Sequence, residues 1–573
     1  MRLFLCVSAL IVLAFAPLAC AQSGRTPGGV AYDEVQALRV QGDPMVDPKS
    51  PEATRQAIGL FEKALQILDR REVEESANGN VALKFRRFDV ELDLAQAYAA
   101  LGDTNAAIEH LEKSARVATL GGGVDLMLKI RPGLAPLRDD PRFLAVMQHS
   151  TAAEHLWRHP QIAVPYSDTL SAEQRLAGLS VFWQEVNDNF VHFDHVPALD
   201  WDKVYLESIP KVLAASTTRD YYDVLMRLAP LLQDAHINIY PPKELENRFY
   251  ARPPLRTERI EGRVFVRAVY SAALAKRVRD GDEIVAIDGE RVDDYAQTHV
   301  RPYESSSTPQ DADVRAYDYG LLAGDAARPV TLTLRDARNA ERTVTIARSG
   351  YTDEHRPQPA PFRDLGDGVV YFAVDGFEDD ASVTAFEQAL PRIRKAKALI
   401  LDARDNGGGS TTYGLQILSY LTHRPIPTLH ARVREYTALP RLTGMASIEW
   451  RALDAQDFVQ PHKEVFEGAV ALLIGPRTFS AGEDFVASFQ MLQRGPLIGE
   501  PTAGSTGQPL LIDLPGGGSA RICAKRDEYP DGTSFVGTGI APEIAVPRTI
   551  ADLRAHRDGA LERAKSELRQ RLR

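Results

Sequence analysis

The chain has 573 residues, 44% of them hydrophobic and 25% charged, and its formal net charge is -11. This length predicts about three or four domains, and the composition is typical of a soluble globular protein. The acidic balance argues against a nucleic-acid-binding protein, which usually carries a basic face. After the first segment, no apolar run is long enough to span a bilayer, so no integral membrane span is expected in the mature chain.

Residues 1–21 are predicted to be a signal peptide. Arg2 precedes an apolar run, and Ala19-Cys20-Ala21 forms a small-residue cleavage site. Cleavage near Ala21 would give a periplasmic or secreted protein. The same residues partly resemble a lipoprotein cleavage box, so a lipoprotein anchored at Cys20 is the alternative. Of the three cysteines, only Cys523 would remain in the mature chain, which predicts no internal disulfide and a small core residue at that position.

Helical periodicity dominates the first half of the chain. Residues 22–50 are rich in Gly, Pro, Asp and Ser, which predicts a flexible stretch. Within residues 22–160, apolar positions recur every three or four residues, and the segment 97–111 resembles a tetratricopeptide helix pair. An irregular helical domain is the alternative. Residues 161–245 are predicted to form a helical cap that ends in a short strand over residues 236–240.

The second half of the chain changes to strand patterns. Residues 246–350 contain short strands and an Asp288-Gly289 hairpin signal, and they resemble a PDZ domain. Residues 351–548 alternate strands and helices, which predicts an α/β core. Its clearest buried strands are Ala398 to Asp402 and Ala469 to Ile474. Residues 549–573 are predicted to form a charged C-terminal helix.

Three short segments carry residue types suited to acyl transfer. Ser480 follows a predicted strand at the start of a helix, where backbone N–H groups favour a developing negative charge. The Gly407-Gly408-Gly409 loop can turn N–H groups toward a ligand. His236 is a candidate base. Each segment also has a purely structural interpretation: Ser480 and Glu483 fit a capping box, the glycines fit a plain turn, and a lone histidine usually serves packing.

Taken together, these segments resemble the C-terminal-processing (tail-specific) serine peptidases. The resemblance covers about residues 170–550 and is carried, in the family's order, by Asp234-Ala235-His236, the PDZ-like insert, Asp402-x-Arg404-x-Asn406-x-Gly408-Gly409 and Thr478 to Glu483. It implies a crotonase/Clp-peptidase-like spiral core with Ser480 as nucleophile and His236 as base. It also implies an oxyanion hole formed by the N–H groups of Gly408 and Ala481.

The resemblance leaves the partner of His236 open. Ser505 stands at the lysine position of one family branch, which implies the tricorn-core-like histidine branch instead. That branch uses a glutamate where this chain has Val536, and a serine where it has Ala235. The candidate orienting carboxylates are Asp527, Asp531 and Glu483.

The sequence predicts no metal site and no cofactor. His192 and His195 have a spacing that suits a metal, but no second pair and no H-E-x-x-H motif accompany them, so surface or packing roles are expected.

The predicted function is that of a periplasmic or secreted serine endopeptidase that cleaves peptides or proteins, in particular near their C-termini. The PDZ-like domain would bind an extended peptide end by strand addition, and the helical N-terminal domain is a candidate surface for a protein partner. No nucleic-acid partner is expected. Two alternatives are a catalytically inactive peptide- or ligand-binding protein on the same scaffold, and an envelope scaffold protein acting through its helical repeats.

Overall fold

The structure is a computed structural model that describes residues 27–77, 81–117, 131–147, 161–350, 360–436, 438, 440–445, 448–453 and 459–572. The expected signal peptide, with Cys6 and Cys20, lies outside these residues. The chain divides into two compact units, one made mainly of the residues before Pro160 and the other mainly of the residues from Pro160 onward. No helix in the described part of the chain is both long and apolar enough to cross a membrane.

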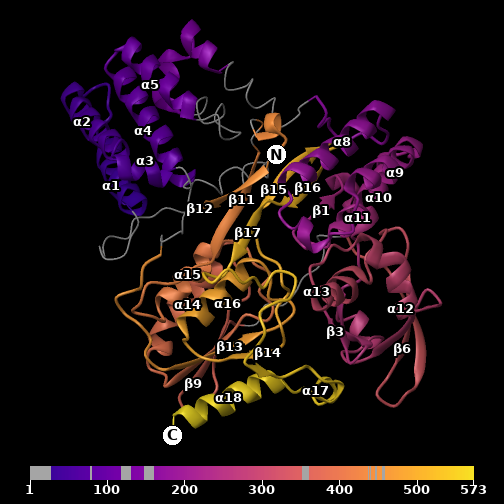
Figure 1. Ribbon diagram of the computed structural model, residues 1–573. Helices are drawn as coiled ribbons and strands as arrows, with labels where there is room; N and C mark the ends of the chain where they lie inside the picture. The colour runs from indigo at the N-terminus through magenta and orange to yellow at the C-terminus, as the bar shows by residue number, and fades with distance from the viewer. Residues whose placement is uncertain are drawn as a thin grey trace. The chain divides into compact units, whose positions relative to one another are not determined.

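The secondary-structure elements in the described part of the first unit are all helices (Figure 1). Its helices are α1 (Pro27–Gly42), α2 (Pro51–Leu68), α3 (Arg71–Ala77), α4 (Val81–Ala100) and α5 (Thr104–Val117). Helix α1 corrects the expectation of a flexible stretch over residues 22–50. Its Tyr32 and Val35 are buried in one core with Phe61 of α2, so burial of an apolar face outweighs the local Gly and Pro content. The tetratricopeptide-like character of α4 and α5 stays a prediction.

The second unit is built on a six-stranded sheet with the order β18-β14-β13-β10-β9-β8. Only the β8–β9 pair is antiparallel. The strands are β8 (Phe362–Asp364), β9 (Val369–Ala373), β10 (Ala398–Asp402), β13 (Ala469–Ile474), β14 (Leu497–Gly499) and β18 (Ile544–Ala545). The apolar runs of β10 and β13 are buried, as expected for central parallel strands.

Helices cover both faces of this sheet (Figure 1). Helices α14 (Ala381–Ile393), α15 (Thr411–Ser419) and α16 (Ala481–Leu492) lie on one side, and α18 (Gly559–Arg571) lies on the other. The single C-terminal helix predicted for residues 549–573 is wrong, because α17 (Ile550–Arg554) and α18 are separate. His556 between them has a left-handed φ of 50°, and Asp558 caps the start of α18.

Two small sheets and three helices form the cap region. The sheets have the orders β1-β16-β15 and β12-β11-β17. Their strands are β1 (Asn238–Tyr240), β11 (His430–Tyr436), β12 (Ile448–Leu453), β15 (Pro509–Leu514), β16 (Gly518–Cys523) and β17 (Lys525–Glu528). The helices are α8 (Ala172–Asn189), α9 (Trp201–Ala214) and α10 (Thr218–Met226). Because β1 pairs antiparallel with β16, the segment around His236 lies beside the C-terminal half of the core.

The insert between cap and core is a mainly antiparallel sheet with the order β2-β3-β4-β6-β7, and β5 pairs with β4. Its strands are β2 (Leu255–Ile260), β3 (Arg263–Val269), β4 (Glu283–Ile287), β5 (Glu290–Arg291), β6 (Val330–Arg335) and β7 (Glu341–Ile346). Its short helices are α11 (Glu246–Phe249), α12 (Val292–Tyr295) and α13 (Pro309–Val314). At the start of α13, Thr308 Oγ1 donates to Ala503 O at 2.7 Å, which joins the insert to the loop after β14.

Candidate active site

Ser480 occupies a strained turn between β13 and α16. Its φ of 57° and ψ of -126° lie in a region that non-glycine residues rarely adopt, at a cost of about 1–3 kcal/mol. Its side chain makes no capping hydrogen bond to the helix, so the capping-box interpretation of Ser480 and Glu483 is wrong. Strain at an uncapped serine on a strand-to-helix turn is the geometry that exposes a nucleophilic hydroxyl.

His236 lies directly opposite this serine. Its Nε2 is 2.9 Å from Ser480 Oγ, and its Nδ1 is 2.8 Å from Ser505 Oγ. The imidazole stacks on the ring of Phe479, with ring centroids 4.6 Å apart. Asp234 Oδ1 accepts the backbone N–H of His236 at 2.7 Å. These contacts orient both ring nitrogens toward hydroxyl groups.

Ser505 is the residue whose side chain faces Nδ1 of His236, where the sequence offered only candidate carboxylates. Besides facing Nδ1 of His236, its backbone O accepts the N–H of Ser480 at 3.0 Å. Glu483 contacts the backbone of the Ser505 segment. Its Oε2 accepts the Ser505 N–H at 2.8 Å, and its Oε1 accepts the Gly504 N–H at 2.7 Å. A third bond comes from the Thr502 hydroxyl at 2.5 Å. The carboxylate therefore positions the Ser505 segment rather than the imidazole itself.

The other two candidate carboxylates bind elsewhere. Asp527 forms a 2.9 Å ion pair with Lys525. Asp531 accepts the N–H and the hydroxyl of Thr533 in an exposed turn. Neither is recorded in contact with His236 among the described residues. The sequence signal for Ser505 is the Gly504-Ser505-Thr506-Gly507 segment, in which a hydroxyl replaces the lysine of the other family branch.

The glycine loop packs against Ser480. Gly408 has a φ of +97°, and a Cβ added there would lie 2.7 Å from the Cβ of Ser480. The Gly408 N–H donates to the side-chain Oδ1 of Asn406 at 2.9 Å, and the backbone O of Asn406 accepts the Phe479 N–H. Asn406 is fully buried and links the loop to the nucleophile turn. The N–H groups of Gly408 and Ala481 therefore lie next to Ser480. In this structure the Gly408 N–H donates to Asn406 Oδ1.

The electrostatic environment favours a neutral His236. Burial lowers its pKa well below the usual 6.5, and the nearby charges of Arg521 and Arg315 lower it further. A neutral imidazole that donates one N–H to Ser505 can accept the proton of Ser480. Burial raises the pKa of Glu483 to about 8, while the three hydrogen bonds that its carboxylate accepts favour the ionised form.

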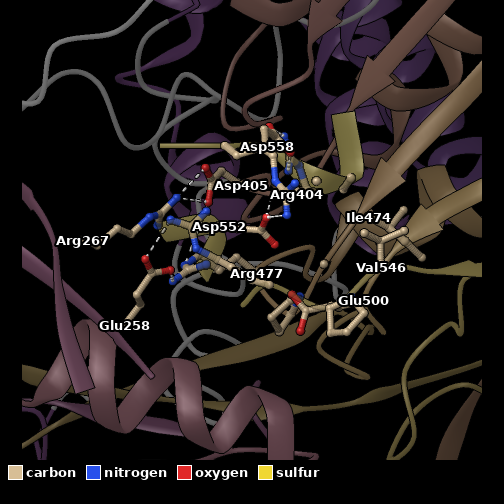
Figure 2. Close-up of a pocket in the computed structure, with 18 residues that line it drawn as sticks. Glu258, Arg267, Arg404, Asp405, Ile474, Arg477, Glu500, Val546, Asp552 and Asp558 are labelled. Carbon is tan, nitrogen blue, oxygen red and sulfur yellow. Dashed lines mark hydrogen bonds and ion pairs between the residues drawn. The ribbon is translucent and has the colours of Figure 1, made fainter. Parts of the chain in front are cut away.

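A network of ion pairs connects the insert to both loops around Ser480 (Figure 2). Arg267 of β3 donates to both oxygens of Asp405 at 2.9 and 2.8 Å, next to Asn406. Arg477, three residues before Ser480, donates to Asp318 of the insert at 2.8 Å. Arg267, Asp405 and Arg477 border a polar cavity of about 260 Å³ at the carboxyl ends of β10, β13, β14 and β18. Neither Ser480 nor His236 lines this cavity.

A serine on a strained strand-to-helix turn, a facing histidine and a glycine loop on an α/β sheet are typical of serine hydrolases. The family model described as Peptidase family S41 matches residues 368–546. Residues 368–546 of this chain are therefore similar to the peptidase domain of that family.

The similar curated proteins are named as carboxyl-terminal-processing peptidases. The chloroplastic Carboxyl-terminal-processing peptidase 2 of Arabidopsis thaliana is 23% identical, over 32% of this chain and 32% of its own length. The chloroplastic C-terminal processing peptidase of Tetradesmus obliquus is 24% identical, over 46% of this chain and 52% of its own length. This chain therefore spans at most about half the length of these two relatives.

A solved structure shares the fold. The structure of mature CPAF complexed with lactacystin has a TM-score of 0.55 and 17% sequence identity. The match covers 69% of this chain and 98% of that chain. The similarity therefore extends beyond the core domain, and it supports the mixed helical and sheet architecture inferred from the sequence.

Proposed function

We propose that the chain is a serine endopeptidase in which Ser480 is the nucleophile and His236 the base. The observation that carries the proposal is the 2.9 Å distance between His236 Nε2 and Ser480 Oγ, at a serine with a left-handed φ. An uncapped hydroxyl next to a neutral imidazole is suited to attack on a carbonyl carbon.

The reaction follows from these contacts. Ser480 Oγ attacks the scissile carbonyl carbon while its proton passes to His236 Nε2. The N–H on Nδ1 of the resulting imidazolium donates to Ser505 Oγ, which keeps the ring in place. The Ala481 and Gly408 N–H groups would hold the oxyanion, and the Gly408 bond to Asn406 would weaken at that step. The imidazolium then protonates the leaving amine, and water hydrolyses the acyl-enzyme.

The substrates would be peptides or proteins cleaved near their C-termini. The names of the similar curated proteins support this class. The insert, predicted to be PDZ-like, would bind an extended peptide end by strand addition at an edge of its sheet, whose edge strands are β2 and β7. A periplasmic or secreted location is proposed from the predicted signal peptide.

A fluorophosphonate probe tests the nucleophile. The intact protein should be labelled once, and Ser480→Ala should abolish labelling. Ser410→Ala is the matched control, because Ser410 is an exposed serine of the glycine loop whose side chain makes no capping bond. Equal labelling of Ser480→Ala, or no labelling of the intact protein, would overturn the enzyme assignment in favour of the ligand-binding alternative.

A further inference from the structure

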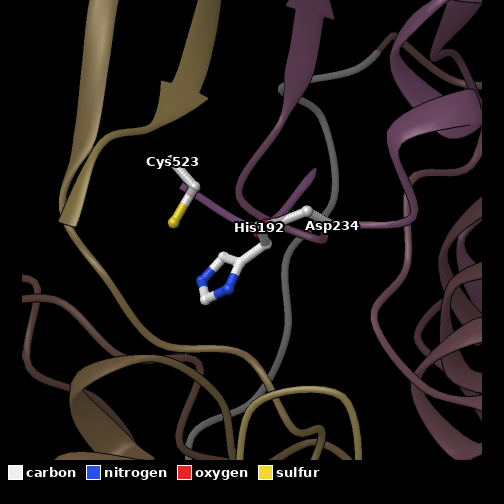
Figure 3. A group of neighbouring side chains, drawn as sticks. All are labelled: His192, Asp234 and Cys523. Carbon is white, nitrogen blue, oxygen red and sulfur yellow. The ribbon is translucent and has the colours of Figure 1, made fainter. Parts of the chain in front are cut away.

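A second group of side chains with metal-ligating atoms lies behind His236. His192, Asp234 and Cys523 each offer one such atom, and these atoms lie within 4.8 Å of one another. The three residues are 1%, 2% and 0% exposed. Figure 3 shows the sulfur of Cys523 pointing toward the imidazole of His192.

Three separate elements bring the group together. His192 lies in the turn after α8, Asp234 follows α10 and precedes β1, and Cys523 ends β16. The Val191 N–H donates to Cys523 O at 3.3 Å, which fixes the first element against the third. The pairing of β1 with β16 fixes the second against the third. The arrangement therefore belongs to the folded cap rather than to a mobile loop.

The imidazole of His192 is left without hydrogen bonds. Neither Nδ1 nor Nε2 has a partner among the residues that the structure describes, although the side chain is almost completely buried. Buried polar groups are nearly always paired, and an unpaired one costs about 1–3 kcal/mol. Coordination of a cation would satisfy one of these nitrogens.

We propose that His192, Asp234 and Cys523 form a buried binding site for Zn²⁺ or a similar thiophilic divalent cation. One imidazole nitrogen, one thiolate and one carboxylate oxygen are ligand types that Zn²⁺ takes in proteins, and three protein ligands leave a fourth position for water. Binding displaces the proton of the Cys523 thiol. The thiolate and the carboxylate then balance the two positive charges of the ion.

His192 also belongs to a second group of side chains with metal-ligating atoms. Asp194 and His195 form a second group with His192, again within 4.8 Å of one another. The rings of His192 and His195 stack with centroids 4.8 Å apart. His192 is therefore shared between an outer group at the surface and the inner group with the thiol.

The inner group is linked to the candidate base. Asp234 uses Oδ1 to hold the backbone N–H of His236, so an ion on Asp234 would bind the carboxylate that positions this residue. Because an ion that binds only the folded state stabilises it, Zn²⁺ should raise the melting temperature of the protein.

Co²⁺ is the probe for the test, because a Co²⁺–thiolate bond gives a charge-transfer absorption band. The full chain carries Ser480→Ala together with Cys6→Ser and Cys20→Ser, so that Cys523 is its only thiol and the result does not depend on peptidase activity. Titration should give the band with one ion per chain, and Zn²⁺ should remove it. Cys523→Ala should abolish the band, and His192→Gln should weaken binding at least about tenfold.

His195→Gln is the matched control, since it changes only the outer group and should leave the thiolate band in place. Absence of a thiolate band at millimolar Co²⁺ would overturn the proposal. So would Zn²⁺ affinity that survives Cys523→Ala but is lost in His195→Gln, because the ion would then occupy the outer group. If Cys523→Ala does not fold, the band in the parent chain and its weakening in His192→Gln still decide the question.

Discussion

The Nδ1 of His236 faces the hydroxyl of Ser505 at 2.8 Å, while the backbone O of the same serine accepts the N–H of Ser480. One residue therefore contacts both members of the proposed catalytic pair. In this site a hydroxyl, and not a carboxylate, orients the imidazole.

Ser505→Ala should lower kcat about 10- to 100-fold with little change in KM, because the Nδ1–H of His236 loses its acceptor. Ser505→Thr keeps a hydroxyl and should restore most of kcat, which a purely structural role would not predict. Steady-state kinetics on a peptide substrate measure both values. Ser534→Ala, a partly buried serine bonded to Asp527 O, serves as control. An unchanged kcat in Ser505→Ala would contradict the role.

Gly408→Ala should abolish probe labelling, with a rate loss of about 100-fold or more. The new Cβ would lie 2.7 Å from Ser480 Cβ and 2.9 Å from Phe479 O, on a residue with a φ of +97°. The neighbouring Gly407→Ala is the matched control, because its Cβ would meet nothing within 4 Å. Equal labelling rates in the two variants would show that close packing at Gly408 does not matter.

Glu483→Gln should lower both stability and kcat. The buried carboxylate accepts bonds from Thr502, Gly504 and Ser505, and an amide nitrogen in place of one oxygen leaves a donor unpaired at a cost of about 1–3 kcal/mol. Denaturant unfolding and kinetics measure the two effects. The exposed Glu562→Gln should change neither. A Glu483→Gln variant as stable as the parent would contradict this account.

Glu304→Gln should gain stability relative to the parent chain as the pH rises from 5 to 8. Burial raises the pKa of Glu304 from 4.5 to about 7, despite the opposing charges of Arg315, Arg252 and Arg301. The folded state then holds a proton that the unfolded state loses, so this contribution is full below pH 4.5 and disappears as the pH passes through about 7.

Glutamine at position 304 does not titrate, so the difference in melting temperature between variant and parent should grow across this range. Melting curves at several pH values measure it, with the exposed Glu378→Gln as control. A difference that is constant with pH would contradict the raised pKa.

Local patterns predicted the central strands well. Ala398–Asp402 and Ala469–Ile474 coincide with β10 and β13, because short apolar runs between polar turns have few other ways to be buried. Local patterns failed for α1 and for the C-terminal helix. Helix α1 is held by contacts with Phe61, and the break before α18 depends on the backbone at His556, neither of which leaves a clear periodic signal.

The order of strands, helices and short motifs along the chain was enough to predict the α/β class of the core and its resemblance to the peptidase family, because such motifs can be read from a linear string. The folded structure was needed to show that the Ser480 side chain makes no capping bond to α16, that Ser505 faces His236, and that Asp527 and Asp531 bind elsewhere. The physical reason is separation along the chain: His236 and Ser505 are 269 residues apart, and the pairing of β1 with β16 is what brings their two segments together.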